Sequence, residues 1–269
     1  MGGMAEAPKN LMGEQALRAS DSGRIRWSMV AETLSRPYKV SLSMVVLVSL
    51  VPLYIFIAEL AREGRPRVLE SALDRLVPLQ PTWAIVYGSL YLFMIMLPVF
   101  VVRQEEQIRR TVRAYLMVWI AAYVCFLVYP TMASRPAQVI GEGFVVWGLR
   151  FLYSADPPYN CFPSLHVAHS FVSALSCYRV HRGVGIAAAL CASLVGVSTL
   201  YTKQHYVVDV IAGMFLAAVA YVAFLRRYPR AAIPELERRL APVLALGILG
   251  SLGLLVAGLW VAYLWIGRG

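Results

Sequence analysis

Seven long apolar runs, spread along the whole chain, are the feature that most constrains its fold. A helix needs about 20 mostly apolar residues to cross a bilayer, and in lipid it must satisfy its own backbone hydrogen bonds. Hydrophobic residues make up 59% of the 269 residues and charged residues only 15%. Soluble domains are about one quarter charged, so the composition excludes a soluble protein. The runs are Ser41–Leu60, Trp83–Val102, Ala114–Thr131, Ser164–Tyr178, Val184–Tyr201, Tyr206–Leu225 and Pro242–Ile266.

These runs predict an all-α fold, a polytopic membrane helix bundle with a six-span core and one extra C-terminal span. The fourth run is short and carries two histidines, which makes it the weakest of the seven by hydropathy. Because a polar stretch precedes the first run, we expect that run to be a membrane span and not a cleavable signal peptide. We expect a polar cytoplasmic tail at 1–37, a membrane-embedded core at 38–228, and a basic loop with the additional span at 229–269.

The net charge of +10 predicts an orientation in the membrane, because loops rich in Lys and Arg tend to stay in the cytoplasm. With a cytoplasmic N-terminus and seven alternating spans, most of the 25 Lys and Arg residues fall on cytoplasmic segments. We therefore expect that orientation, and we interpret the basic excess as a signal for topology and for contact with anionic membrane lipids. No recognition motif points to nucleic acid, so no such partner is expected.

Two segments between the runs are expected to lie at the membrane surface. Residues 61–82 carry apolar side chains at helical spacing, which indicates a short interfacial helix. The long loop at 132–162 contains an aromatic stretch from Phe144 to Tyr153, which we expect to lie in the interface rather than to span the membrane.

His205 and Asp209 stand four residues apart in STLYTKQHYVVD, a polar segment between two apolar runs. If the sixth span starts near His205, both side chains lie on one face of a helix. A carboxylate one turn along can fix the tautomer of an imidazole and raise its basicity, which suits a nucleophile or a general base. The alternative is a buried polar pair that holds helices together. Ionisable groups in membrane domains are costly and usually functional, which favours catalysis.

A second polar cluster lies in NCFPSLH at 160–166. Pro163 followed by Ser164 predicts a helix start, where free N–H groups and the positive dipole end can bind phosphate. Ser164 adds a hydroxyl donor, and His166 in the first turn can donate a proton to a leaving oxygen. A simple capping serine and an interfacial histidine fit these residues equally well. His169 lies one turn deeper, and we expect it to pack or to support the site rather than to react.

Arg135 and Lys203 are expected to add positive charge on the same side of the membrane. An arginine fork matches phosphate oxygens, although an isolated arginine is more often solvated or bound to lipid headgroups. Lys203 stands two residues before His205. On the predicted topology, the loop with Arg135, the start of the fourth span and the His205 segment all face the extracytoplasmic side.

Together these residues favour phosphoryl transfer without a metal. No carboxylate cluster is available for Mg²⁺, which argues against metal-clamped transfer, and the four cysteines have no C-x-x-C spacing for zinc. We therefore expect no metal and no cofactor. In the remaining chemistry His205 attacks phosphorus, Asp209 supports it, and His166 protonates the leaving group. The equatorial oxygens would be held by backbone amides, Arg135, Lys203 and Ser164.

The motifs resemble those of the type 2 phosphatidic acid phosphatase superfamily, which shares its site with the vanadium haloperoxidases. That family carries K-x6-R-P, P-S-G-H and S-R-x5-H-x3-D. The second motif matches here at Pro163, Ser164 and His166, and the third at Ser198, His205 and Asp209. The resemblance implies a nucleophilic His205 with Asp209 as its partner, His166 as general acid, and Ser198 among the substrate-binding residues.

Several family positions differ in this chain. The first motif survives only as Arg135 and the proline after it, because Val128 stands where its lysine would be. Leu165 replaces the glycine of the second motif, and Thr199 replaces the arginine of the third. Two phosphate ligands of the family are therefore missing. We expect Thr199 to remain at the substrate-binding position and Lys203 to be a candidate replacement.

The resemblance covers roughly 83–225 and implies a lipid phosphatase acting on a phospholipid or prenyl-phosphate substrate. The pattern YPTMASRP…FPSLHVA…STLYTKQHYVVDVIAG is similar to the branch that includes the inositol phosphorylceramide synthases. A phosphotransferase with a lipid or polyol acceptor is therefore the alternative, and a non-catalytic lipid-binding relative is a second one. The expected location is a bacterial inner membrane, with the active site on the extracytoplasmic face.

Overall fold

The computed structural model describes residues 42–266, with side chains from Leu50 to Trp265. The expected tail at 1–37 lies outside the described residues. Helices dominate the described part of the chain, which contains two isolated β-bridges and no strand. The predicted all-α fold is confirmed.

Each of the seven apolar runs lies largely within one helix. These helices are α3 (Leu42–Glu63), α5 (Trp83–Val101), α6 (Glu105–Val128), α8 (Leu165–Val180), α9 (Arg182–Tyr201), α10 (Val207–Ala220) and α11 (Glu235–Ile266). Helices α6 and α11 begin well before their runs, at Glu105 rather than Ala114 and at Glu235 rather than Pro242. A π-helical segment, Tyr221–Leu225, continues α10. Three short helices lie between them: α4 (Ala72–Leu76), α7 (Phe144–Ala155) and the 3-10 turn Arg230–Ala232.

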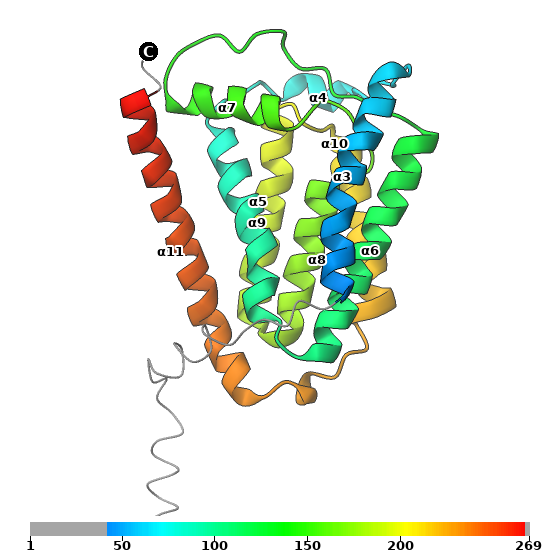
Figure 1. The fold of residues 1–269 in the computed structure, drawn as a ribbon, viewed down its shortest axis with the longest axis vertical. Helices are drawn as coiled ribbons and strands as arrows, with labels where there is room; N and C mark the ends of the chain where they lie inside the picture. Colours follow the sequence, from blue (N-terminus) through cyan, green and yellow to red (C-terminus); the bar gives the residue numbers. More distant parts are fainter. Residues whose placement is uncertain (1–41, 267–269) are drawn as a thin grey trace, which may run out of the picture. The chain divides into compact units, whose positions relative to one another are not determined.

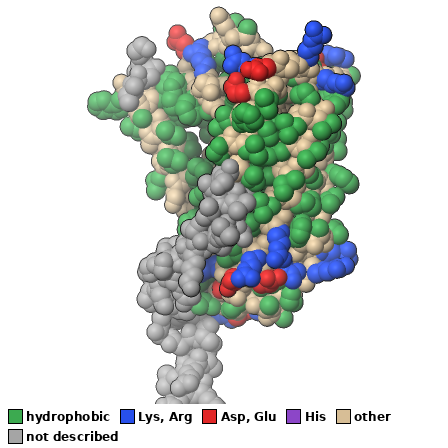
Figure 2. Space-filling model, turned by 45° about the vertical axis from the view of Figure 1, so that its right-hand side comes forward, with side chains coloured by type: hydrophobic (Ala, Val, Ile, Leu, Met, Phe, Trp, Pro, Cys, Tyr) green, Lys and Arg blue, Asp and Glu red, His purple; other side chains and the backbone are tan. Residues whose placement is uncertain are grey.

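The length and apolar composition of the described helices identify the chain as a membrane protein. Five described helices are long and apolar enough to cross a bilayer, namely α5, α6, α9, α10 with its π-helical extension, and α11. The other two predicted spans are α8, which has only 16 residues, and α3, whose first side chains are not described. Figure 2 shows a hydrophobic surface between two bands of charged side chains, one toward each end of the bundle. This distribution fits a bundle that crosses a membrane.

Helix α8 is the centre of the bundle and packs against α5, α6, α9 and α10. Its small side chains allow this close packing, and most of them are fully buried. The contact with α10 depends on Gly213, where a Cβ would lie 2.6 Å from the backbone oxygen of Ser164. A glycine at this position therefore lets the N-terminal ends of α8 and α10 lie side by side.

Helices α4 and α7 lie at the same end of the bundle as the N-termini of α8 and α10 (Figure 1). Helix α4 provides the short helix predicted within 61–82, and Ser71 and Asp74 close its first turn with a capping box. Helix α7 comes from the aromatic stretch of the long loop. Its Phe144 and Trp147 rings each lie 5.8 Å from the ring of Tyr263 in α11, which ties α7 to that helix. Their position in a membrane interface stays a prediction.

The loops expected to be cytoplasmic meet at the opposite end. The Arg110 guanidinium lies over the Tyr228 ring, and the Gln104 side chain donates a hydrogen bond to Glu237 at 2.7 Å. Arg179 at the end of α8 also donates to the backbone oxygen of Tyr228. The domain boundaries expected at 38, 228 and 229 stay predictions.

Candidate active site

The site begins where α8 and α10 start next to each other. The backbone N–H of Ser164 donates to the oxygen of Asp209 at 3.1 Å, which joins the two helix starts directly. Ser164 caps α8, because its hydroxyl accepts a hydrogen bond from the N–H of Val167 at 3.4 Å. The helix start predicted at Pro163 and Ser164 is confirmed, and the Ser164 hydroxyl is engaged in this cap.

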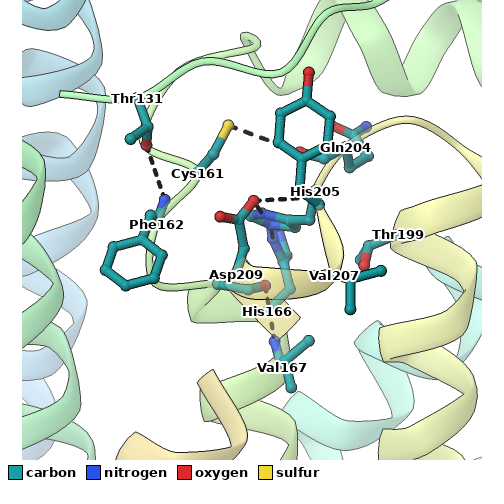
Figure 3. Close-up of polar contacts among 12 residues, drawn as sticks. Thr131, Cys161, Phe162, His166, Val167, Thr199, Gln204, His205, Val207 and Asp209 are labelled. Atoms are coloured by element: carbon teal, nitrogen blue, oxygen red, sulfur yellow. Dashed lines mark hydrogen bonds and ion pairs between the residues drawn. The ribbon is translucent and has the colours of Figure 1, made fainter. Parts of the chain in front are cut away.

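His205 and Asp209 form a buried pair at the start of α10 (Figure 3). Nδ1 of His205 lies 3.4 Å from Oδ2 of Asp209, and the two residues are only 6% and 0% exposed. The same carboxylate oxygen accepts the N–H of Tyr206 at 2.9 Å. The hydrogen bond from the Tyr206 N–H fixes the Asp209 carboxylate next to Nδ1 of His205. The other ring nitrogen of His205, Nε2, therefore faces the site.

His166 links this pair to a tyrosine on α5. Its Nδ1 lies 3.1 Å from Nε2 of His205, and its Nε2 lies 2.6 Å from the hydroxyl of Tyr87. With neutral rings, one proton order satisfies every contact. Tyr87 donates to His166 and His166 donates to His205, which puts the His205 proton on Nδ1, the nitrogen 3.4 Å from Oδ2 of Asp209. This order gives His205 a lone pair on Nε2, which is the form a nucleophile needs.

A second carboxylate lies on the other side of His166. Oδ2 of Asp156, the residue directly after α7, is 3.8 Å from Nε2 of His166. The Tyr54 hydroxyl from α3 donates to Oδ1 of Asp156 at 3.1 Å. The side chains of His166 and Asp156 are only 14% and 17% exposed. When His166 is protonated, Asp156 therefore carries the compensating charge at a short distance.

Arg135 borders the histidines and is held by three groups. One guanidinium nitrogen donates to the backbone oxygen of Asp156 at 2.6 Å, and another donates to the side-chain oxygen of Gln204. The Arg135 guanidinium also lies 4.7 Å from the centre of the Tyr153 ring. Burial raises the pKa of Tyr153 to about 12, so its hydroxyl stays neutral and donates to the oxygen of Thr202 at 2.8 Å.

The Lys203 amine is directed to α4 rather than to the histidines. It donates to the backbone oxygens of Asp74 and Val77, while the Asp74 carboxylate accepts the N–H of Val207 at 2.8 Å. These bonds tie the loop before α10 to α4. Phosphate binding by Lys203 stays a prediction.

Ser198 and Thr199 support the loop that carries His205. Their hydroxyls donate to the oxygens of Val195 and Gly196, at 2.6 and 2.7 Å. The backbone oxygen of Thr199 accepts the N–H of Gln204 at 2.8 Å and that of His205 at 3.3 Å. Both side chains are fully buried, and their hydroxyls are used within α9.

His169 lies deeper in α8 and is stacked on Tyr115, with ring centres 4.3 Å apart and planes at 18°. Trp119 and Tyr91 complete the aromatic surroundings of its ring, at 6.5 and 6.2 Å between centres. This environment matches the packing role predicted for His169.

One group of potential metal ligands lies among the described residues. Ligand atoms of Cys161, His205 and Asp209 come within 4.8 Å of one another. Burial, together with the nearby Asp209 carboxylate, raises the pKa of the Cys161 thiol well above its usual range. A neutral thiol is a poor ligand, because metals bind the thiolate. A metal at this place would first have to displace the thiol proton.

The site also contains residues that the sequence did not single out. Tyr54 and Tyr87 lie within apolar runs without any local polar pattern. Asp156 stands in the turn-rich segment ADPPYN, and Gln204 stands next to His205. An acidic residue in the loop that leads into FPSLH was the one signal available for Asp156. Its distance to His166 depends on how α7 packs, which no local pattern gives.

Fold and site together define a polytopic membrane protein with two histidines and an aspartate at one end of its bundle. A family model described as the PAP2 superfamily matches residues 65–223. This match covers more than half of the chain, and the chain therefore belongs to the PAP2 superfamily. Membership gives it phosphatase-type chemistry, which ends in hydrolysis or in transfer of the phosphoryl group.

One curated relative is a PA-phosphatase related-family protein of Dictyostelium discoideum. It is 31% identical over an alignment of 133 residues that covers 43% of this chain and 23% of the relative. The chain thus matches less than a quarter of the length of that relative. No solved structure gives a significant match to the chain.

Proposed function

We propose that this protein is a lipid phosphatase that acts through a phosphohistidine at His205. The observation that carries the proposal is the continuous contact from Asp209 through His205 to His166, with distances of 3.4 and 3.1 Å. The substrate would be a lipid phosphomonoester or diphosphate, such as a phospholipid or a prenyl phosphate. We place the reaction on the extracytoplasmic face, and the expectation of a bacterial inner membrane is part of the proposal.

In the first half-reaction, Nε2 of His205 forms a bond to phosphorus while the bond from phosphorus to the ester oxygen breaks. His166 gives its proton to that oxygen, so the lipid leaves as an alcohol. A phosphoryl group in line with Nε2 needs the space between the two rings. Binding of substrate therefore replaces the direct hydrogen bond between His166 and His205.

In the second half-reaction, water attacks phosphorus and the bond to Nε2 of His205 breaks. The water proton passes to His166, which restores the acid for the next turnover, and phosphate leaves. The negative oxygens need donors throughout both steps. Arg135 lies at this place, and its Nε and the Nε2 of Gln204 have no hydrogen-bond partner among the described residues. These donors support the proposal that Arg135 binds the phosphoryl group.

The reaction is proposed to need no metal. Oδ2 of Asp209 accepts the N–H of Tyr206 and lies 3.4 Å from His205, and Asp156 accepts a hydrogen bond from Tyr54. Arg135 supplies the positive charge that a divalent cation supplies in metal-dependent phosphoryl transfer. Removal of divalent cations should therefore leave the activity intact.

Transfer to an alcohol is the second candidate function. The observation in its favour is the burial of the nucleophile, since His205 is 6% and Asp209 0% exposed. A site closed to bulk water favours an ordered acceptor over hydrolysis. In this case a lipid or polyol hydroxyl takes the place of water in the second half-reaction, as in the inositol phosphorylceramide synthase-like branch.

The test is phosphate release by the full chain in detergent with EDTA, offered phosphatidate, undecaprenyl diphosphate and lysophosphatidate in turn. We expect release by the wild type and none by His205→Ala. Product analysis with added inositol or diacylglycerol separates transfer from hydrolysis. Equal turnover by His205→Ala would contradict the phosphohistidine. No turnover of any lipid, with or without acceptor, would favour the non-catalytic lipid-binding alternative.

A further inference from the structure

The site contains a carboxylate that the proposed two-step reaction does not yet use. Asp156 ends α7, and it lies on the side of His166 away from His205. Among the described side chains, His166 is the one basic group within ion-pair distance of this carboxylate, at 3.8 Å. A mostly buried carboxylate is costly unless it is paired, so this position calls for an explanation.

The neutral and the protonated forms of His166 need different surroundings. In the neutral form, Nε2 accepts a hydrogen bond from Tyr87 at 2.6 Å. In the protonated form Nε2 becomes a donor, and the ring carries a positive charge beside the Arg135 guanidinium. That form is the one that can protonate a leaving oxygen. It therefore needs an acceptor with negative charge near Nε2, and Asp156 lies there.

The Asp156 carboxylate is itself held in place. The Tyr54 hydroxyl donates to Oδ1 at 3.1 Å, which leaves Oδ2 directed to His166. The Asp156 backbone is fixed at both of its polar groups, because its N–H donates to Leu152 at 3.0 Å and its oxygen accepts from Arg135 at 2.6 Å. Such fixed partners are typical of groups that orient a catalytic histidine.

We propose that Asp156 is the positioning residue for the general acid, so that His166 and His205 each have their own carboxylate. Asp209 serves the nucleophile His205, and Asp156, oriented by Tyr54, stabilises the protonated form of His166. This inference rests on the proposed function and deepens it. It predicts that Asp156 matters in proportion to how much the leaving group needs a proton.

Substrates with different leaving groups distinguish a positioning role of Asp156 from a purely structural one. Phenyl phosphate and 4-nitrophenyl phosphate have nearly the same size, but nitrophenolate leaves readily without a proton. An alkoxide, as released from dioctanoyl phosphatidate, needs a proton most. Loss of general acid catalysis costs about 10²-fold or more when the leaving group is poor. A variant that has merely lost its structure loses activity on all three substrates alike.

The experiment measures kcat/KM for these three substrates with EDTA, using the full chain in detergent. For Asp156→Asn we expect a loss of about 100-fold on dioctanoyl phosphatidate, an intermediate loss on phenyl phosphate, and less than about 3-fold on 4-nitrophenyl phosphate. Tyr54→Phe keeps the carboxylate, and it should show the same order with smaller losses. Asp209→Asn is the matched control, and it should lower all three values together because every substrate needs the nucleophile.

The outcomes separate the inference from the proposed function. Equal losses for Asp156→Asn on all three substrates, or no loss on phosphatidate, would overturn the role of Asp156 while His205 remains the nucleophile. Full activity of His205→Ala would overturn the proposed function and the inference together. Thermal unfolding of each variant in detergent checks that Asp156→Asn is folded.

Discussion

Three histidines lie near one another, and their neighbours give each a different role. His205 has a carboxylate at one ring nitrogen and an open lone pair at the other. His166 contacts His205, the Tyr87 hydroxyl and the Asp156 carboxylate. His169 is stacked on the Tyr115 ring, and no carboxylate is paired with it among the described side chains. The residue type alone does not decide the chemistry, because it is the hydrogen-bond partner that fixes the tautomer.

Arg135 offers a prediction about substrate binding. Its planar fork bonds to Gln204 and Asp156 while its face lies on Tyr153, and a lysine cannot make all of these contacts. We expect Arg135→Lys to lower kcat/KM by about 10-fold or more, since a hydrogen bond to a charged group contributes about 1.5–3 kcal/mol. Arg150→Lys on α7 is the matched control and should leave kcat/KM unchanged. Wild-type kinetics for Arg135→Lys would rule out this role.

Cys161 gives a prediction about pH. Burial and the Asp209 carboxylate raise the pKa of this thiol, so at any given pH less thiolate is present than for an exposed cysteine. Iodoacetamide reacts with the thiolate. Alkylation of Cys161 in the folded protein, followed by mass spectrometry of its peptide, should be slow at neutral pH and still accelerate above pH ~9. Fast alkylation that levels off below that pH would contradict the assigned environment.

At the scale of elements, the site depends on contacts between helix ends that are distant in sequence. Helix α7 carries both Tyr153 and, directly after it, Asp156, so its position sets the surroundings of Arg135 and His166 at once. Helix α4 receives the Lys203 amine and gives a carboxylate to the start of α10. The two short surface helices therefore orient the residues that the long helices bring together.

Lys203 tests whether its contact with α4 stabilises the fold or whether its amine binds the phosphate of the substrate. Its bonds to the oxygens of Asp74 and Val77 predict that Lys203→Met loosens α4 and lowers the thermal unfolding temperature. The KM for lipid substrate should change little, and activity loss should follow loss of folded protein. A higher KM without loss of stability would instead assign Lys203 to phosphate binding, as its place in the sequence first indicated.

Gly213 tests the contact between α8 and α10. An added Cβ would lie 2.6 Å from the Ser164 oxygen and 3.2 Å from Cβ of Val167. We expect Gly213→Ala to cost about 1–3 kcal/mol of stability and to lower kcat, because it moves the start of α8 relative to His205. Thermal unfolding and kcat measure the two effects. Gly258→Ala, where nothing lies within 4 Å, should leave kcat unchanged and should not lower stability. Unchanged values for Gly213→Ala would refute this packing.

At the scale of the whole molecule, much of the fold follows from the sequence. Apolar runs predicted the helices because each span must satisfy its own hydrogen bonds, so local composition is sufficient. The i, i+4 spacing predicted the pairing of His205 with Asp209, and the predicted topology placed His166 on the same side of the membrane. Asp156 and Tyr87 were not predicted as partners, because their distances to His166 come from packing between helices rather than from any local pattern. Substrate binding by Ser198 and Thr199 was indicated by the motif alone and stays a prediction; in this structure their hydroxyls donate to backbone oxygens within α9.

The most direct test of the central claim is to trap the phosphoenzyme. Protein turning over phosphatidate labelled with ³²P in its phosphate, in EDTA, is quenched in alkaline denaturant, where a phosphohistidine survives. The labelled peptide is then identified by mass spectrometry. The account predicts label on His205, more of it in His166→Ala if that change slows hydrolysis more than formation, and none in His205→Ala. Label on another residue, or sustained turnover without any label on His205, would contradict it.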